Sequence, residues 1–443
     1  MTADLVVVTP WYPTVDKPFG GAFVRSMTAA VVPHVDTVRT IHLDEWPLVS
    51  GKVAQYAVTD MTRDLMQRGA TRRLRDVPDG GELSLPVPVQ PRSPYDLAAD
   101  EASRSLRAVV DPDALPEIVH AHVGLPAGWA SHLAFPDDVG LFVTEHATFL
   151  HRMTHEARPR RMYRDVAARA DRLFAVSTLL AEQLADLFPG ARDKIEVVPN
   201  AIPFDRFPCR SLQSPTPLAR WLYVGSLQAR KGVVELVRAF ATCHARHDEI
   251  TLTLLGDGPQ REELLALVEE LEIADAVHFV DPVAPDEVFP IMLEHDLLTH
   301  ASRYETFGMT MVEAAATGMA LLVTASGGPE ESLDGVIDDL GVMVEVSEDP
   351  DVIANGYERL RARAGELDVA RGRSVLRGRY GTRAIGARLA GAYGVPSVKP
   401  DDPTAVDAGD VKGNGVTAAE VAPHEPARGG PVPEILDPEV EQP

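Results

Sequence analysis

The chain has 443 residues, 45% of them hydrophobic, and this length is enough for two or three domains rather than one core. Its formal net charge of −24 argues against broad nucleic-acid binding, and no apolar run approaches the roughly 18 residues of a membrane-spanning helix. Two cysteines, Cys209 and Cys243, offer no disulfide framework or metal cluster. Together with an apolar strand that starts at Leu5, they predict a cytoplasmic protein.

Short apolar runs alternate with helical stretches in the first half of the chain. Continuous apolar runs are typical of strands that are covered on both faces in a parallel sheet. The predicted strands of this half are residues 5–9, 35–43, 117–123, 141–146, 172–177 and 195–199.

The alternation stops in a stretch rich in proline and serine, residues 208–217, and then restarts. The two series predict an α/β protein with two doubly wound, Rossmann-like domains, residues 1–205 and 218–380, which face each other across a cleft. Ligands bind beyond the carboxyl ends of such strands, so we expect the active site in the cleft. The strands of the second series are predicted at 221–227, 250–256, 277–280, 296–301, 320–324 and 342–346, and two of its helices at 233–246 and 260–271.

The end of the chain differs in composition. From residue 396 onward it holds nine prolines and ten acidic residues against three Lys or Arg, a local charge of −7. Such a segment buries too little apolar surface to offset the entropy lost on ordering. We therefore predict a disordered acidic tail over residues 396–443.

The segment from Glu305 to Gly318 places two carboxylates eight positions apart. Gly308 opens a run of helix formers that Gly318 closes, so Glu305 should lie just outside a helix N-terminus and Glu313 about one turn inside it. The first N–H groups of a helix lack intrahelical acceptors and the dipole is positive there, which suits a phosphate. The carboxylates can accept hydrogen bonds from a sugar and a ribose. The predicted contacts of a nucleotide sugar are therefore Glu305, Gly308, Met309, Thr310 and Glu313.

The fuller string around this segment is more specific than the spacing alone. It closely resembles the signature of retaining glycosyltransferases with the GT-B fold, in particular glycosyltransferase family 4, the glycosyl transferases group 1. The matching residues are Glu305, Phe307, Gly308, Glu313, Ala314 and Gly318, followed by Ser326-Gly327-Gly328-Pro329-Glu330.

The resemblance implies that a sugar moves from a UDP- or GDP-type nucleotide-sugar donor to a glycan, lipid-linked or small-molecule acceptor. This is a reaction of polysaccharide or glycoconjugate biosynthesis. The resemblance further implies a catalytic role for Glu305, a donor contact at Phe307, and no metal ion or other cofactor. It also implies that the first domain binds the acceptor, and that a helix over residues 381–395 returns to that domain.

A second motif lies in the strand–loop that opens the second domain, residues 223–232. It resembles the family's loop in which an arginine and a lysine hold the donor diphosphate. Lys231 falls on the lysine position and is implied to be catalytic, whereas Ser226 stands at the usual arginine position. Arg230 can supply the second charge, because a guanidinium binds phosphate through paired hydrogen bonds. The alternative is that Arg230 and Lys231 are solvated cations at a helix start.

Glycine-rich turns mark two further places that match the family. Gly256, in Gly256-Asp257-Gly258-Pro259, is implied to shape the nucleotide side of the cleft, and residues 280–283 to contact the base through backbone, which leaves the base unidentified. In the first domain Gly20 and Gly21 match a loop that closes over the donor phosphate and the acceptor. An ordinary turn is the alternative there.

Three histidines occupy predicted strand ends of the first domain. His146 resembles the position where the family's histidine contacts the donor sugar near the reacting carbon, which implies a catalytic role. His120 and His122 share one strand face, since side chains alternate. A metal pair is conceivable from that spacing, but the sequence offers no third ligand. We expect them to be structural or to line the acceptor site, with His122 nearer the cleft.

Two charged features have structural interpretations that involve no ligand. Asp111-Pro112-Asp113 looks like a metal motif of another glycosyltransferase fold, but its proline-interrupted setting predicts a turn. The basic stretch from Arg152 to Arg172 contains acidic residues that favour a solvated helix face. Peripheral contact with an anionic membrane is the alternative, as in membrane-associated relatives.

Other functions remain open for the same fold. A sugar-nucleotide epimerase would need acid/base carboxylates and no separate acceptor, and a phosphorylase of the glycogen type would need a lysine for a bound cofactor. A non-catalytic nucleotide-binding relative is the third alternative, because Ser226 departs from the family pattern.

Overall fold

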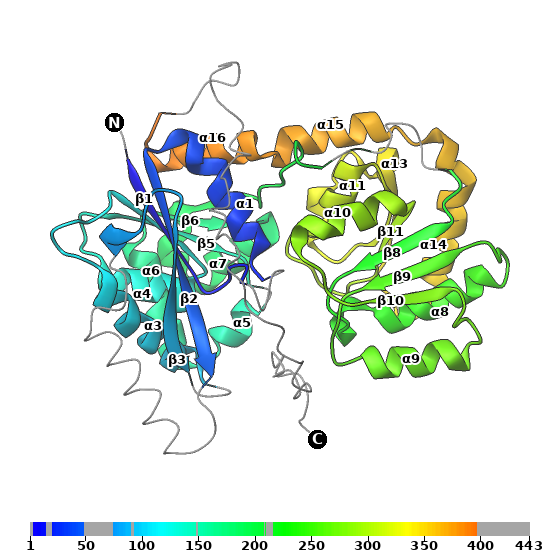
Figure 1. Ribbon diagram of the computed structural model, residues 1–443, viewed down its shortest axis with the longest axis horizontal. Coiled ribbons are helices and arrows are strands. Elements are labelled where there is room, and N and C mark those ends of the chain that lie inside the picture. The colour runs from blue at the N-terminus through cyan, green and yellow to red at the C-terminus, as the bar shows by residue number, and fades with distance from the viewer. Residues whose placement is uncertain are drawn as a thin grey trace, which may run out of the picture.

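The structure is a computed structural model that describes residues 3–14, 20–47, 74–89, 93–147, 149–207, 209 and 216–396. These residues form two bodies, each built on a parallel sheet with helices packed around it (Figure 1). The prediction of an α/β protein with two doubly wound, Rossmann-like units is thereby confirmed. The predicted tail lies outside the described residues from residue 397 onward, as does most of the proline-rich stretch before residue 216.

The first sheet has, within the described residues, seven parallel strands in the order β3-β2-β1-β4-β5-β6-β7. Its strands are β1 (Asp4–Thr9), β2 (Thr37–Pro47), β3 (Glu82–Val89), β4 (Ile118–His122), β5 (Gly140–Glu145), β6 (Arg172–Ala175) and β7 (Ile195–Val197). The helices of this body are α1 (Ala22–Val31), α3 (Tyr95–Val109), α4 (Trp129–Ala134), α5 (Leu150–Met153), α6 (Ala157–Arg169) and α7 (Thr178–Leu187).

The central strand shows why its sequence is apolar throughout. In β1, Val6 and Val8 belong to one buried cluster, whereas Leu5 and Val7 belong to a second cluster on the other face of the sheet. Because alternate side chains point to opposite faces, a strand covered on both sides needs apolar residues at every position.

Strand β3 is not predicted by the sequence. It contains Pro86 and Pro88, and a proline cannot donate a hydrogen bond to a neighbouring strand. The strand lies at the edge of the sheet and pairs with β2 alone, so the missing donors are tolerated. Its alternate residues Leu83, Leu85 and Val87 are buried, which is the packing that holds this edge in place.

The second sheet has six described parallel strands in the order β10-β9-β8-β11-β12-β13. They are β8 (Arg220–Val224), β9 (Thr251–Leu255), β10 (Val277–Val280), β11 (Leu297–His300), β12 (Ala320–Thr324) and β13 (Gly341–Val344). The helices of this body are α8 (Val233–His244), α9 (Arg261–Glu270), α10 (Pro285–Glu294), α11 (Met309–Thr317), α12 (Gly328–Ser332), α13 (Ile337–Leu340) and α14 (Pro350–Arg363).

The last two described helices connect the bodies. α15 (Val369–Tyr380) lies along the second body and α16 (Thr382–Tyr393) lies beside α1 of the first (Figure 1). Gly386 of α16 packs so close to the backbone of Ala30 that a side chain there would overlap its carbonyl oxygen. Ile385 and Leu389 are fully buried in the cluster that α1 shares with β1.

Strand order reverses between β1 and β4 in the first sheet and between β8 and β11 in the second. Ligands of such sheets bind beyond the carboxyl ends of the strands at these switch points. No helix in the described part of the chain is both long and apolar enough to cross a bilayer.

Candidate functional site

Loops that follow β8, β9 and β11 meet through backbone contacts that only glycine permits. A Cβ atom on Gly256 would overlap the carbonyl oxygen of Gly225, and one on Gly232 would overlap that of Ala301. These contacts bring the loop after β8, with Lys231 next to Gly232, against the loop after β11, which leads to Glu305. Residues far apart in the sequence thereby share one place at the carboxyl ends of the strands.

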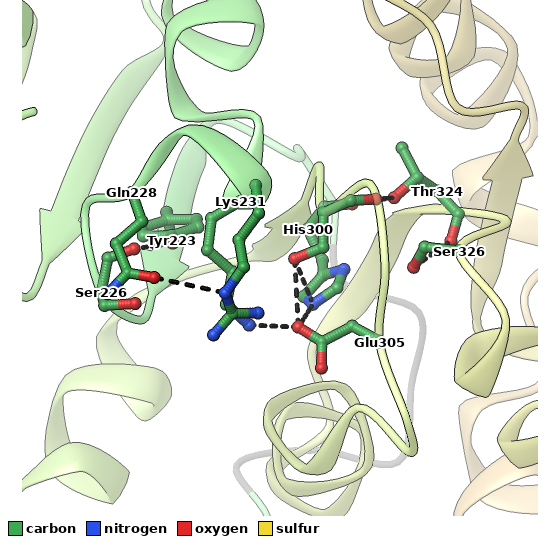
Figure 2. Close-up of polar contacts among 10 residues, drawn as sticks. Tyr223, Ser226, Gln228, Lys231, His300, Glu305, Thr324 and Ser326 are labelled. Carbon is green, nitrogen blue, oxygen red and sulfur yellow. Dashed lines mark hydrogen bonds and ion pairs between the residues drawn. The ribbon is translucent and has the colours of Figure 1, made fainter. Parts of the chain in front are cut away.

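Lys231 and Glu305 form an ion pair in which both side chains are largely buried, at 17% and 11% exposure (Figure 2). The same carboxylate oxygen accepts a hydrogen bond from Ser302 Oγ at 3.1 Å and lies 3.4 Å from His300 Nε2. Burial alone would raise the pKa of the Glu305 carboxyl, but the hydrogen bond from His300 and the charge of Lys231 outweigh it and hold the pKa well below its usual range.

Helix α11 begins and ends with glycines in the left-handed region, Gly308 with φ 82° and Gly318 with φ 89°, as its sequence predicts. Its first turn carries Met309 and Thr310, whose N–H groups face the end where Glu305 lies. The ring of Phe307 is buried edge-on against Tyr380, 5.1 Å between centroids, so its backbone alone is left for a donor contact.

Glu313 lies one turn into α11 and is half-buried. Within the described part of the chain it has no hydrogen-bond or ion-pair partner. Burial raises the pKa of its carboxyl to about 7. A carboxyl that the protein leaves without a partner is available to accept hydrogen bonds from the hydroxyl groups of a ligand.

Arg230 supplies a second basic group beside Lys231. Its Nε donates to Gln228 Oε1 at 3.2 Å, and its Nη1 is buried without a hydrogen-bond partner in the structure. The carbonyl oxygen of Ser226, the residue at the family's arginine position, accepts a hydrogen bond from the Tyr223 hydroxyl at 2.8 Å. A buried guanidinium N–H without an acceptor is the kind of donor that a phosphate oxygen can satisfy.

The first body contributes three buried histidines at the carboxyl ends of β4 and β5. His122 Nδ1 lies 2.9 Å from His146 Nε2, and the His120 and His122 rings are stacked. His120 bridges the Thr144 and Tyr393 hydroxyls at 2.6 Å each, so it is a buried structural group. Burial lowers the pKa of His120 and of His146 to about 3, which leaves both rings neutral at physiological pH.

The start of α1 lies next to His146. Gly21 caps α1, and the Phe23 ring lies 4.6 Å from the His146 ring, which places the Gly20-Gly21 turn on the same side of the body as the histidines. Phe19, which precedes this turn, lies outside the described residues.

The residue before His146 has a role that the sequence did not suggest. Glu145 is buried and accepts hydrogen bonds from the N–H groups of Gly124, His146 and Ala147 and from the Tyr163 hydroxyl, at 2.7–3.2 Å. This carboxylate therefore ties the loop after β4 to the loop after β5 and fixes the place of His146.

The two bodies touch beside this site. Glu331 of α12 accepts hydrogen bonds from the Thr178 N–H at 2.6 Å and the Thr178 hydroxyl at 2.9 Å, at the N-terminus of α7. Gln183 of α7 donates to the Tyr304 hydroxyl at 3.1 Å, and Tyr304 directly precedes Glu305. A carboxylate of one body thus binds a helix N-terminus of the other, which is a favourable arrangement.

The two remaining charged features lie in ordinary settings. Asp111 accepts a hydrogen bond from the Asp113 N–H at 3.1 Å, which is the predicted turn. Among the described residues no group of three or more His, Cys, Asp or Glu is arranged to hold a metal ion. On the basic stretch Arg158 pairs with Asp96 and Asp100, and Arg169 with Asp137.

His300, Ser302, Tyr304 and Gln183 are site residues that the sequence analysis missed. His300 ends a buried strand of the second sheet, and His146 directly follows one of the first, so this placement was a signal that could have identified His300. No local pattern identifies Gln183 or Tyr304, because their contact joins residues 121 positions apart.

Models of two protein families match the chain. "Glycosyltransferase Family 4" matches residues 55–206 and "Glycosyl transferases group 1" matches residues 210–364. Glycogen synthase of Mycobacterium tuberculosis is 30% identical over 229 residues, which cover 49% of this chain and 54% of that protein. D-inositol 3-phosphate glycosyltransferase of Nocardia farcinica is 31% identical over 239 residues, 50% of this chain and 49% of that protein. The chain thus spans about half the length of the curated relatives it matches.

Solved structures resemble the whole two-body arrangement. Sucrose-phosphate synthase from Thermosynechococcus elongatus superposes with a TM-score of 0.66 at 18% identity, covering 88% of this chain and 98% of that one. Anabaena HepE in complex with UDP gives a TM-score of 0.61 at 16% identity, covering 89% and 100%. Taken together, the two family matches and the shared fold show that the chain belongs to glycosyltransferase family 4, the glycosyl transferases group 1, with the GT-B fold.

Proposed function

We propose that the protein is a retaining glycosyltransferase that moves a sugar from a nucleotide-diphosphate donor to an acceptor. The observation that carries this proposal is the buried Lys231–Glu305 pair beside the N-terminus of α11, with Glu313 one turn away and without a partner among the described residues. A cation, free N–H donors and two carboxylates fit a diphosphate that is flanked by a sugar and a ribose.

In this proposal the second domain, residues 218–380, binds the donor. Lys231, Arg230 and the N–H groups of Gly308, Met309 and Thr310 hold the diphosphate. Glu305 takes the sugar hydroxyls and Glu313 the ribose, while Gly256 lets the backbone approach the nucleotide. As the glycosidic bond breaks, negative charge develops on the diphosphate, so donors fixed in advance lower the barrier.

The first domain, residues 1–205, is proposed to bind the acceptor. His146 faces the reacting carbon as a neutral ring, with His122 beside it on the acceptor side, and the Gly20-Gly21 turn closes over both substrates. The acceptor attacks from the face that the diphosphate leaves, through an oxocarbenium-like transition state. We place this reaction in the cytoplasm, and it requires no metal ion or other cofactor. Solved relatives include complexes of HepE with UDP and with UDP-glucose, so uridine nucleotide sugars are the first donors to test.

A thermal-shift screen of UDP-, GDP- and ADP-sugars tests donor binding. A donor at a hundred times its Kd should stabilise the native state by about 2.7 kcal/mol, a rise of several degrees in Tm. NMR of the products then separates the functions. Transfer with retained anomeric configuration supports the proposal, an inverted sugar centre on the donor would mean an epimerase, and sugar phosphate formed from inorganic phosphate would mean a phosphorylase. If no nucleotide sugar raises Tm, the proposal is wrong.

The two glutamates should fail in different ways. Glu313→Ala should weaken donor binding by about 1–3 kcal/mol, because it loses a hydrogen bond to a donor hydroxyl. Glu305→Ala should raise the barrier to turnover by about 1–3 kcal/mol for the same reason, and should affect folding less. Donor titrations and turnover of both variants check this. Full activity in both variants would contradict the site assignment.

A further inference from the structure

The Glu305 carboxylate has a set of partners that does not depend on Lys231. Ser302 and His300 both reach the carboxylate oxygen that Lys231 binds, and Figure 2 shows the His300 and Lys231 side chains directed toward Glu305. His300 and Ser302 are 6% and 0% exposed. Their loop is pinned by Thr324 of β12, whose hydroxyl donates to the Ser302 carbonyl at 2.6 Å. These residues therefore form a rigid support behind Glu305.

The hydrogen bonds determine which nitrogen of His300 carries the proton. A carboxylate only accepts, so the single Ser302 hydroxyl proton points to Glu305. The Ser302 oxygen is then an acceptor toward His300 Nε2, 3.3 Å away, and Nε2 must carry the hydrogen. Within the residues that the structure describes, His300 Nδ1 is buried without a hydrogen-bond partner, which an unprotonated nitrogen tolerates better than an N–H group. His300 thus donates toward both Ser302 and Glu305.

A bound donor would compete for the cation of this pair. The proposed function places the diphosphate on Lys231, and the two negative charges of the diphosphate attract a lysine more strongly than the single charge of one carboxylate does. Once Lys231 turns to the donor, Glu305 becomes a buried carboxylate without its cation, which is a costly state unless other groups bind it. His300 and Ser302 are the groups in place to do so.

We propose that His300 is a positioning residue that holds Glu305 in place when Lys231 exchanges Glu305 for the donor diphosphate. This inference rests on the proposed function for the exchange itself. The support of Glu305 by His300 is a property of the protein without ligand and can be measured there. Two sets of experiments therefore separate a failure of this inference from a failure of the proposed function.

The first set is a double-mutant cycle in melting temperature, without ligand. His300→Leu should lower Tm by about 3 °C more in the Lys231→Ala protein than in the wild type, because His300 is then the main partner of a buried charge. In a Lys231→Ala/Glu305→Gln background this extra loss should vanish, since the charge is gone. Additive effects of His300→Leu and Lys231→Ala would overturn the inference.

His247 offers a matched control in the same domain. His247 follows the end of α8, and its Nε2 lies 3.1 Å from Oε1 of Glu358 on α14, away from the proposed site. His247→Leu removes a comparable histidine–carboxylate contact and should combine additively with Lys231→Ala. The same coupling for His247 as for His300 would mean that the cycle reports general destabilisation, and the inference would fall.

The second set measures turnover with the nucleotide sugar that gives the largest thermal shift. His300→Leu should lower kcat at least about tenfold while donor KM changes less than about threefold, since ground-state contacts are kept and Glu305 is misplaced. His300→Gln, whose amide can donate from the Nε2 position, should restore most of the loss. A loss confined to KM, or equal losses in His300→Leu and His300→Gln, would overturn the positioning role.

Discussion

Glu305 and Glu313 lie on one short segment, yet their surroundings shift their pKa values in opposite directions. Burial raises the pKa of Glu313 to about 7, whereas at Glu305 the contacts with His300 and Lys231 outweigh burial. Near neutral pH Glu305 is therefore a fixed carboxylate, while Glu313 is close to the point where it changes charge.

Glu313 should impose a pH dependence on stability. The unfolded chain releases this proton near pH 4.5 but the native protein keeps it until about pH 7, so the native state binds more protons in between. The stabilising contribution of the Glu313 proton is complete below pH 4.5 and is lost as the pH rises through 7. The stability of Glu313→Gln relative to wild type should thus increase by about 1–3 kcal/mol between pH 5 and 8.

Denaturant unfolding of both proteins at several pH values checks this prediction. Glu305→Gln is the control, because the pKa of Glu305 lies below this window and the difference from wild type should stay constant across it. A flat difference for Glu313→Gln would mean that Glu313 titrates as an exposed glutamate.

The Lys231→Ala variant should lose most of its activity, because it lacks the ammonium nearest to the proposed diphosphate. The loss should correspond to a reaction barrier that is higher by roughly 2–4 kcal/mol. Ser226→Arg should be tolerated, and should recover part of the loss when combined with Lys231→Ala. Turnover of the three variants with the donor from the screen decides this. A near-normal rate for Lys231→Ala would place the phosphates elsewhere.

At the scale of elements, the two glycines that bound α11 allow the effect of backbone strain on stability to be distinguished from a role in donor turnover. Gly308 and Gly318 both have φ near 85°, so backbone strain should make alanine at either position cost about 1 kcal/mol of stability, and at Gly308 the added Cβ would also overlap the end of the Met311 side chain. Only Gly308 lies at the end where the diphosphate is proposed. Gly308→Ala should therefore lower donor turnover at least about tenfold, whereas Gly318→Ala should leave it nearly unchanged. Equal turnover in the two variants, measured beside their melting temperatures, would contradict the proposed use of this helix end.

The sequence predicts elements well where one local signal dominates. The runs at β10 and β12 and the glycine-bounded α11 were predicted at their observed positions, because apolar continuity and left-handed glycines are local features. Other predicted strands run past the observed ends, as at β7, where buried Val198 continues the apolar pattern after pairing stops. Edge strand β3 was missed, since pairing on one side tolerates prolines that a central strand would exclude.

Contacts between separate loops, and contacts between the two bodies, were beyond prediction. The chemistry of Glu305 could be inferred from its helix, but its three partners come from β11, the loop after it and the loop after β8. The contact of Gln183 with Tyr304 depends on how the two domains dock, which no spacing in the sequence encodes.

For the whole molecule, the docking of α7 on the second domain links domain arrangement to the site. The loops around Tyr304 and Glu331 are themselves joined, since Glu305 N–H donates to the Ser326 carbonyl at 2.9 Å and Gly328 N–H to the Glu305 carbonyl at 2.9 Å. Contacts of α7 with either loop therefore act on Glu305. α7 lies on the side of its domain that faces the second one (Figure 1).

Removing these contacts should open the cleft without unfolding either domain. In a Glu331→Ala/Tyr304→Phe variant, small-angle scattering should show a larger radius of gyration, and turnover should fall about tenfold because closure places Glu305 against the sugar. Tm should change by no more than a few degrees, since both contacts are near the surface and each domain keeps its own core.

Asp286→Ala is the control: its contacts with Arg206 at 3.2 Å and Arg25 at 3.9 Å also join the bodies, but they are exposed and do not touch the loops around Glu305. An unchanged scattering curve with unchanged turnover in the double variant would show that α7 plays no part in placing Glu305.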